Sequence, residues 1–283
     1  MIAVRATRKV GRMESVRIVE QWPVDHAATA VVRADGTVAG AYGDQHRLFR
    51  LASVTKPITA YAALIAVEEG AVHLDDPAGP EGSTVAHLLA HTSGLAFDEH
   101  KAAWAPGRRR LYSNAGFEQL ADHVAKRSGI PFAEYVRDGL LEPLGMTETV
   151  YEGSPAAGAS STVADLVRFA AELQAPTLLD PSTVQQATTV RFPGLVGVLP
   201  GFGMQSPNDW GLGFEIRDGK SPHWTGTTNS PRTFGHFGQA GTFLWVDPDL
   251  GAACIALAGR DFGRWAAEAW PPYSDAVIAE LRA

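Results

Sequence analysis

The sequence predicts an α+β fold, an α/β sandwich in which helices flank an antiparallel sheet of about five strands. Strand patterns occur near both ends of the 283-residue chain, and a mostly helical stretch separates them. The most economical arrangement joins the strands from both chain ends in one sheet. We therefore expect residues 1–75 and 201–283 to form a sheet subdomain, with residues 76–200 inserted as a helical subdomain of the same domain.

The first two strands are expected to form a hairpin. Residues 29–33 and 37–42 are short runs rich in Ala, Val and Thr. Between them, Asp35-Gly36 is a strong signal for a two-residue turn.

A helix is expected to follow over about 53–69. Apolar residues recur at helical spacing from Ile58 to Ala66. Pro57 suits the first turn, where a missing N–H costs least, and Gly70 suits the end.

The remaining elements are short. Glycine and proline separate helical patterns at 84–91, 116–127, 131–141, 161–173 and 181–188. Strand patterns return at 210–216, 242–246 and 252–258. A closing helix is expected over about 264–281, interrupted by Pro271-Pro272.

Composition argues against several kinds of partner. The 24 basic and 31 acidic residues give a net charge of −7, so there is no basic footprint for nucleic acid. No run approaches the 18 apolar residues that a membrane helix needs, and the single Cys254 rules out an internal disulfide. The basic N-terminal segment lacks the apolar core of a signal peptide, which predicts a cytoplasmic protein.

Several common motifs are missing. There is no G-x-S-x-G, no Walker A sequence and no complete G-x-G-x-x-G. His87 and His91 have the spacing of a zinc-binding helix, but the Glu that metalloproteases place beside the first His is absent. We expect neither a metal nor another cofactor.

Three short motifs occur in an order that suggests nucleophilic catalysis. Residues 53–56 read S-V-T-K, residues 112–114 read Y-S-N, and residues 236–238 read H-F-G in a strand region. Residues three apart on a helix share a face, so Lys56 can reach Ser53. A serine hydroxyl attacks well only when a nearby base takes its proton.

Lys56 can serve as that base only if it is neutral. An ordinary lysine has a pKa near 10.4 and is protonated at pH 7. Burial at a helix N-terminus disfavours the charged form, both by desolvation and through the helix dipole. Tyr112 could then share or relay the proton, and Asn114 could orient a substrate amide or the Lys56 amine.

With these motifs, the sequence resembles the serine β-lactamase and penicillin-binding-protein family, in the class C-like branch that also holds esterases and D-amino-acid peptidases. The resemblance runs from about Leu48 to Arg260. It includes the blocks SVTKPITA at 53–60, LLAHTSGL at 88–95, LYSNAG at 111–116, LEPLGM at 141–146 and FGHFGQAGTFLWVDP at 234–248.

The resemblance implies a role for each motif residue. Ser53 would be the acylated nucleophile, Lys56 its base and Tyr112 a second acid or base. Asn114 and the third motif, His236, Phe237 and Gly238, would contact substrate. The oxyanion hole would use the backbone N–H groups of Ser53 and Gln239. The family fold, an antiparallel sheet with an inserted helical subdomain, agrees with the pattern derived above.

The third motif departs from the family pattern. β-Lactamases usually have K-T-G there, so His236 replaces a fixed positive charge with a pH-dependent one. Phe237 replaces the hydroxyl that helps to hold a substrate carboxylate. Both changes, and the missing signal peptide, weaken the case for β-lactams or peptidoglycan termini.

We therefore predict an intracellular serine hydrolase that forms an acyl-Ser53 intermediate, with a small-molecule carboxylic ester or small amide as substrate. The alternative is a β-lactamase or D,D-peptidase. A third possibility is a binding or sensor domain that is acylated and does not turn over. The sequence gives no indication of oligomeric state.

Overall fold

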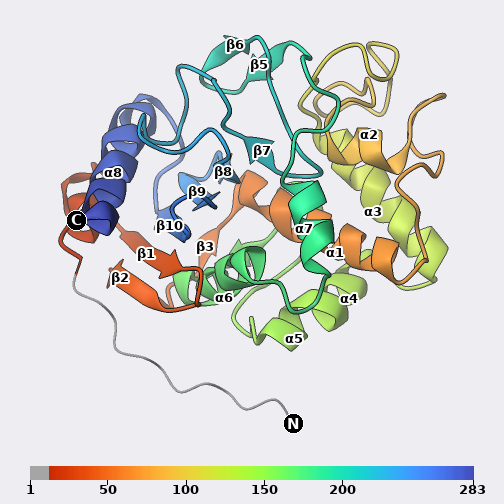
Figure 1. Cartoon of the computed structure of the whole chain (residues 1–283). Helices are drawn as coiled ribbons and strands as arrows, with labels where there is room; N and C mark the ends of the chain where they lie inside the picture. The colour runs from red at the N-terminus through yellow and green to blue at the C-terminus, as the bar shows by residue number, and fades with distance from the viewer. Residues whose placement is uncertain (1–12) are drawn as a thin grey trace.

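A six-stranded antiparallel sheet forms the centre of the computed structural model, which describes residues 13–283 (Figure 1). Strands from the two chain ends pair directly, β1 with β10. This confirms the predicted fold class. In the order β2-β1-β10-β9-β8-β7, the sheet contains β1 (Ala27–Arg33), β2 (Val38–Tyr42), β7 (Glu215–Ile216), β8 (Phe234–Gly238), β9 (Thr242–Asp247) and β10 (Ala252–Ala258).

The sheet differs from the expected one near residue 210. Only the two residues of β7 are strand, whereas the sequence pattern predicted a strand over 210–216. Gly211 donates its N–H to the Phe214 carbonyl and so turns the chain back on itself. The sheet has one strand more than the five expected. The additional strand is β8, which carries the third motif and for which the sequence pattern gives no separate range.

Apolar side chains fill both faces of the sheet. Along β10, Ile255 and Leu257 belong to the core cluster that contains α1, while Cys254 and Ala256 belong to a second cluster with α8. This alternation follows from the period of two in a strand. Because both faces are covered, β10 is buried along its whole length.

Helices surround the sheet, and α1 runs through the middle of the molecule (Figure 1). It packs against both β8 and α3, so its N-terminus lies where the sheet meets the helical part. The helices are η1 (Ser15–Gln21), η2 (Ala52–Val54), α1 (Thr55–Glu68), α2 (Val85–Leu89), α3 (Asn114–Ser128), α4 (Phe132–Val136), η3 (Arg137–Leu141), α5 (Glu142–Leu144), α6 (Val163–Gln174), α7 (Pro181–Ala187) and α8 (Arg264–Arg282). Two small two-stranded sheets pair β3 (Phe49–Arg50) with β4 (Ser160–Ser161), and β5 (Gly197–Leu199) with β6 (Gly203–Gln205).

The expected interruption of the closing helix is wrong. α8 continues through Pro271 and Pro272. Trp270 and Tyr273, on either side of the prolines, are fully buried in the second core cluster. Tertiary packing of this kind overrides local propensity.

Within residues 13–283, no helix is both long enough and apolar enough to cross a membrane. Most of the basic segment on which the expectation of no signal peptide rests lies in residues 1–12, outside the described residues.

Gly213 allows the loop before β7 to approach α1, which gives a stability prediction. Its φ is +89°, and a Cβ there would lie 2.1 Å from the Cβ of Ala60. Gly70 has a similar φ of +75° with nothing within 4 Å of such an atom. We expect Gly70→Ala to cost about 1–2 kcal/mol from backbone strain alone, and Gly213→Ala to cost about 1–3 kcal/mol more from overpacking.

Urea unfolding of both variants measures the difference. Equal losses in the two variants would mean that the contact with α1 does not constrain this position.

Candidate active site

Ser53 lies in η2, the short turn directly before α1. Ala52 before it has a φ of +45°, a left-handed conformation that costs a residue with a side chain about 1–3 kcal/mol. The end of β8 lies against this turn, since a Cβ on Gly238 would be 2.2 Å from the carbonyl oxygen of Leu51. The glycine of the third motif is therefore required by close backbone approach.

The Lys56 amine lies beside the Ser53 hydroxyl, as the spacing on the helix predicted. Its Nζ is 3.3 Å from Ser53 Oγ, 2.7 Å from Asn114 Oδ1 and 3.0 Å from the Ala156 carbonyl oxygen. The side chain is fully buried. Burial lowers the pKa of Lys56 to about 7, although the negative charges of Asp98 and Glu118 act in the opposite direction. The neutral amine is therefore accessible near pH 7.

Tyr112 contacts the same serine from another side. Its hydroxyl donates to Ser53 Oγ at 2.7 Å and lies 3.3 Å from His236 Nε2. Burial raises the pKa of Tyr112 well above its usual value, so the phenol stays protonated near neutral pH. Ser53 therefore lies between an amine that can accept a proton and a phenol that can give one.

His236 is a neutral imidazole in this site. Its Nδ1 is 2.5 Å from the Phe237 carbonyl oxygen, which can only accept, so Nδ1 carries the proton and Nε2 faces Tyr112. Burial lowers the pKa of His236 to about 3, and the nearby Lys56 charge contributes. The third motif thus presents no positive charge near pH 7.

Asp98 is a site residue that the sequence did not reveal. Its carboxylate accepts a hydrogen bond from Asn114 Nδ2 at 2.8 Å. An amide fixed in this way must turn its oxygen the other way, toward Lys56. Asp98 is exposed, so it acts on the buried amine through Asn114 and through its charge.

Trp210 and the buried Glu215 were also missed. The Trp210 ring packs against His236 and Tyr112, with centroids 5.3 Å and 5.8 Å away. Behind it, Glu215 accepts hydrogen bonds from Lys220 at 2.9 Å and from Trp224 at 2.7 Å. Burial opposes ionisation of Glu215, but Lys220 and His223 hold its pKa below the usual range. This ion pair anchors the loop that supports the imidazole.

Phe237 does not join the predicted site. It is adjacent to His236 in β8, so its side chain points to the opposite face of the sheet. There it packs against Phe262 and Trp270 in the second core cluster, with centroids 4.9 Å and 6.0 Å away. The prediction that the Phe237 ring contacts substrate is therefore wrong. The ring is part of the second core cluster.

On the side of β8 nearest the site, only the first two residues of the strand pair with β7. β7 pairs with Phe234 and Gly235 only. The chain then continues through His236 to Gln239, whose side chain turns away and donates to the Phe262 carbonyl at 3.2 Å. The oxyanion role expected for the backbone of Gln239 stays a prediction.

Arg110 is a buried structural residue. It is the last of three consecutive arginines, and its guanidinium donates to four carbonyl oxygens from three segments of chain. These belong to Ala90, Arg191, Phe192 and Asn208. The Y-S-N motif begins two residues later, so this hub fixes the segments around Tyr112.

His87 and His91 have separate surroundings. His91 Nδ1 accepts the Ser113 N–H at 3.1 Å, and its ring lies 4.6 Å from that of Tyr112. The His87 ring stacks on Phe192 at 4.5 Å. In residues 13–283 there is no group of three or more His, Cys, Asp or Glu side chains that could hold a metal ion.

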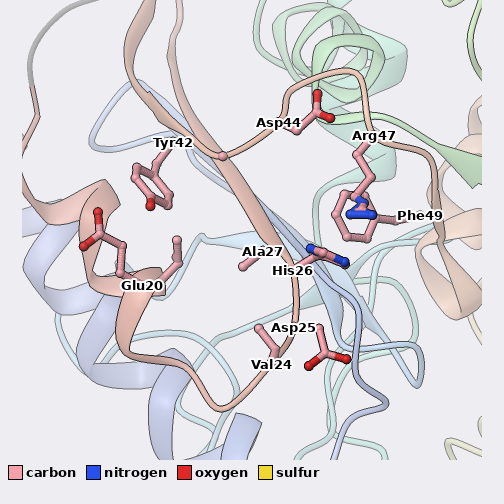
Figure 2. Close-up of a pocket in the computed structure, with 11 residues that line it drawn as sticks. Glu20, Val24, Asp25, His26, Ala27, Tyr42, Asp44, Arg47 and Phe49 are labelled. Atoms are coloured by element: carbon pink, nitrogen blue, oxygen red, sulfur yellow. The ribbon is translucent and has the colours of Figure 1, made fainter.

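Two cavities are relevant to ligand binding. One of about 350 Å³ adjoins Tyr112 and is lined mainly by apolar side chains. Another, of about 500 Å³, lies near the start of β1, and Figure 2 shows Asp25, His26, Asp44 and Arg47 around it. None of the predicted site residues lines the second cavity, whereas Tyr112 lines the first.

Comparison with known proteins identifies related chains. A family model described as Beta-lactamase matches residues 24–277. A solved structure of a beta-lactamase from Mycobacterium bovis is 56% identical, with a TM-score of 0.93, and the match covers 94% of this chain and 99% of that one.

Two curated relatives match more partially. Penicillin-binding protein 4* of Bacillus subtilis is 33% identical over 36% of this chain, and esterase EstB of Burkholderia gladioli is 33% identical over 52%. The matches cover 30% and 48% of those relatives' own lengths.

The burial of Lys56 predicts both a pH dependence and a mutational effect. Only the neutral amine accepts a proton, so the rate of Ser53 labelling by an alkyl fluorophosphonate should rise with pH through a midpoint of about 7. Lys56→Arg should lower this rate by about 10²–10⁴, because arginine stays protonated. Lys126→Arg, on the exposed face of α3, is the matched control. Near-normal labelling of Lys56→Arg would show that another group takes the proton.

The contact between Asp98 and Asn114 predicts a shift of that midpoint. The Asp98 charge raises the pKa of Lys56, so Asp98→Asn should move the midpoint to lower pH. Asn at 98 still offers an oxygen to Asn114, so the hydrogen bond itself can persist. Glu99→Gln removes the same charge from the neighbouring exposed residue and should leave the midpoint in place. The same shift in both variants, or in neither, would contradict a specific role for Asp98.

Proposed function

The chain belongs to the beta-lactamase family of serine hydrolases, and we propose that it cleaves carboxylic esters or small amides through an acyl intermediate on Ser53. One observation carries this proposal: Ser53 Oγ lies between the Lys56 amine and the Tyr112 hydroxyl. The opposite pKa shifts of those two groups suit them to different tasks.

Acylation uses both groups. Neutral Lys56 takes the proton of Ser53 while Oγ attacks the substrate carbonyl carbon. The backbone N–H groups of Ser53 and Gln239 would stabilise the oxyanion. When the tetrahedral intermediate collapses, Tyr112 gives its proton to the departing alcohol or amine. The products of this step are acyl-Ser53, protonated Lys56 and a Tyr112 phenolate beside that cation.

Deacylation returns both protons. The Tyr112 phenolate takes a proton from water, and the resulting hydroxide attacks the acyl carbon. As the ester bond to Ser53 breaks, protonated Lys56 returns its proton to Oγ. The cycle releases a carboxylic acid and restores the resting site without any further acid or base.

The neutral His236 supports a preference for uncharged substrates. A β-lactam carries a carboxylate beside its reactive carbonyl, and a charge-assisted hydrogen bond is worth about 1.5–3 kcal/mol. Its absence implies a handicap of about 10–150-fold for such substrates. Neutral esters have no such handicap.

A β-lactamase activity is the second candidate. The observation that favours it is the 56% identity to the Mycobacterium bovis protein named a beta-lactamase. Both candidates use the same nucleophile, so they differ only in which acyl donors react fast.

Two measurements test the proposal. An alkyl fluorophosphonate should add one label to the wild type and none to Ser53→Ala, and this variant should lose about 10⁶ in kcat, as in another serine hydrolase. Each hydrolysis rate is then divided by that of the uncatalysed reaction, because activated esters react readily in water. On this scale p-nitrophenyl butyrate should exceed nitrocefin by at least about tenfold.

The possible outcomes separate the candidates. A larger enhancement for nitrocefin would support the β-lactamase. One stoichiometric burst without turnover would support a binding or sensor domain. Full activity in Ser53→Ala would exclude the esterase, the β-lactamase and the acylated binding domain, because all three depend on Ser53.

A further inference from the structure

Exposed apolar side chains gather around the cavity beside Tyr112. Within residues 13–283, eight large apolar side chains are exposed, and five of them line this cavity. Between 36% and 60% of their surfaces face solvent. These five, which we call the apolar collar, are Phe97, Trp104, Val196, Val198 and Met204.

The chemistry of the cavity wall suits an uncharged group. Among residues 13–283, no carboxylate lines it. Of its two arginines, Arg110 donates four hydrogen bonds to backbone carbonyls, and the Arg109 guanidinium lies 4.7 Å from the centre of the Trp104 ring. A cation over an aromatic face holds that ring in place. Arg109 thus holds the Trp104 ring of the collar. Val198 and Met204 of the collar are held by the pairing of β5 with β6.

The cavity adjoins the candidate active site at one residue, Tyr112. Tyr112 lines it, and the hydroxyl of that residue is 2.7 Å from Ser53 Oγ. An apolar cavity of about 150 Å³ holds a benzene molecule. This one, at about 350 Å³, has room for an aryl ring or a chain of about six carbons.

We propose that the cavity inside the apolar collar binds an uncharged apolar group of the substrate, an alkyl chain or an aryl ring attached to the ester that Ser53 attacks. This rests on the proposed function. The same group can come from the acyl side or from the alcohol side of the ester, and two substrate series distinguish these sources.

The test compares chain length on each side of the ester. One series is p-nitrophenyl acetate to hexanoate, and the other is methyl to pentyl acetate followed by pH-stat titration. Each buried methylene contributes about 0.8 kcal/mol, so kcat/KM should rise about fourfold per carbon in one series. Over four carbons this amounts to about 200-fold.

Two matched valines supply the control. Val198 lies in the collar and is 51% exposed, whereas Val150 is 41% exposed and lies outside the cavity. Val198→Asp should lower kcat/KM for the longest ester of the responsive series by at least about tenfold, because it places a charge in the apolar wall. The shortest ester of that series should change by less than about twofold. Val150→Asp should leave both values unchanged.

Each result has a separate meaning. Flat profiles in both series, with esters still hydrolysed, would overturn the cavity assignment and would be expected if the collar instead bound another protein. An equal effect of Val150→Asp would overturn it as well. If no ester is hydrolysed and the fluorophosphonate does not label Ser53, the proposed function fails first and the cavity assignment fails with it.

Discussion

The site depends on the burial of one amine whose hydrogen-bond partners are all neutral. Lys56 contacts a hydroxyl, an amide oxygen and a backbone carbonyl, and its nearest influential carboxylates act only from a distance. Transfer of an ammonium group out of water is expensive, and here this penalty appears as a lowered pKa. In bulk water the amine of a lysine keeps its ordinary pKa and stays protonated at pH 7. Lys56 can be neutral at that pH only in a closely packed environment that excludes water.

The rest of the architecture can be understood as the means of covering that amine. Ser53 comes from η2 and Lys56 from the first turn of α1, which the sheet buries from one side. The cover on the other side comes from the middle of the chain. Tyr112 and Asn114 precede or begin α3, and Ala156 belongs to the loop before β4. Neither part of the chain holds a neutral Lys56 by itself, so the helical part is integral to the site.

Much of this arrangement could be predicted from the sequence, and the failures have physical causes. The meeting of Ser53 with Lys56 followed from residue spacing on a helix, and the sheet followed from joining the strand patterns at the two chain ends. Asp98 and Trp210 were missed because their contacts depend on how distant loops fold. Phe237 was misplaced for another reason: a motif gives the order of residues, but strand alternation decides which of two neighbours faces the site. The predicted interruption of α8 at its two prolines was wrong because the burial of the neighbouring aromatic side chains stabilises the helix by more than the prolines destabilise it.

The Arg110 guanidinium has a consequence for local unfolding. One side chain joins the segments at residues 90, 191–192 and 208, and the backbone N–H of the same arginine donates to the carbonyl of Val196, directly before β5. Exposing any one of these carbonyls leaves a buried cation with broken bonds, which is costly. We therefore expect these segments to separate from the molecule together, so that the chain around Tyr112 unfolds locally as a single cooperative unit.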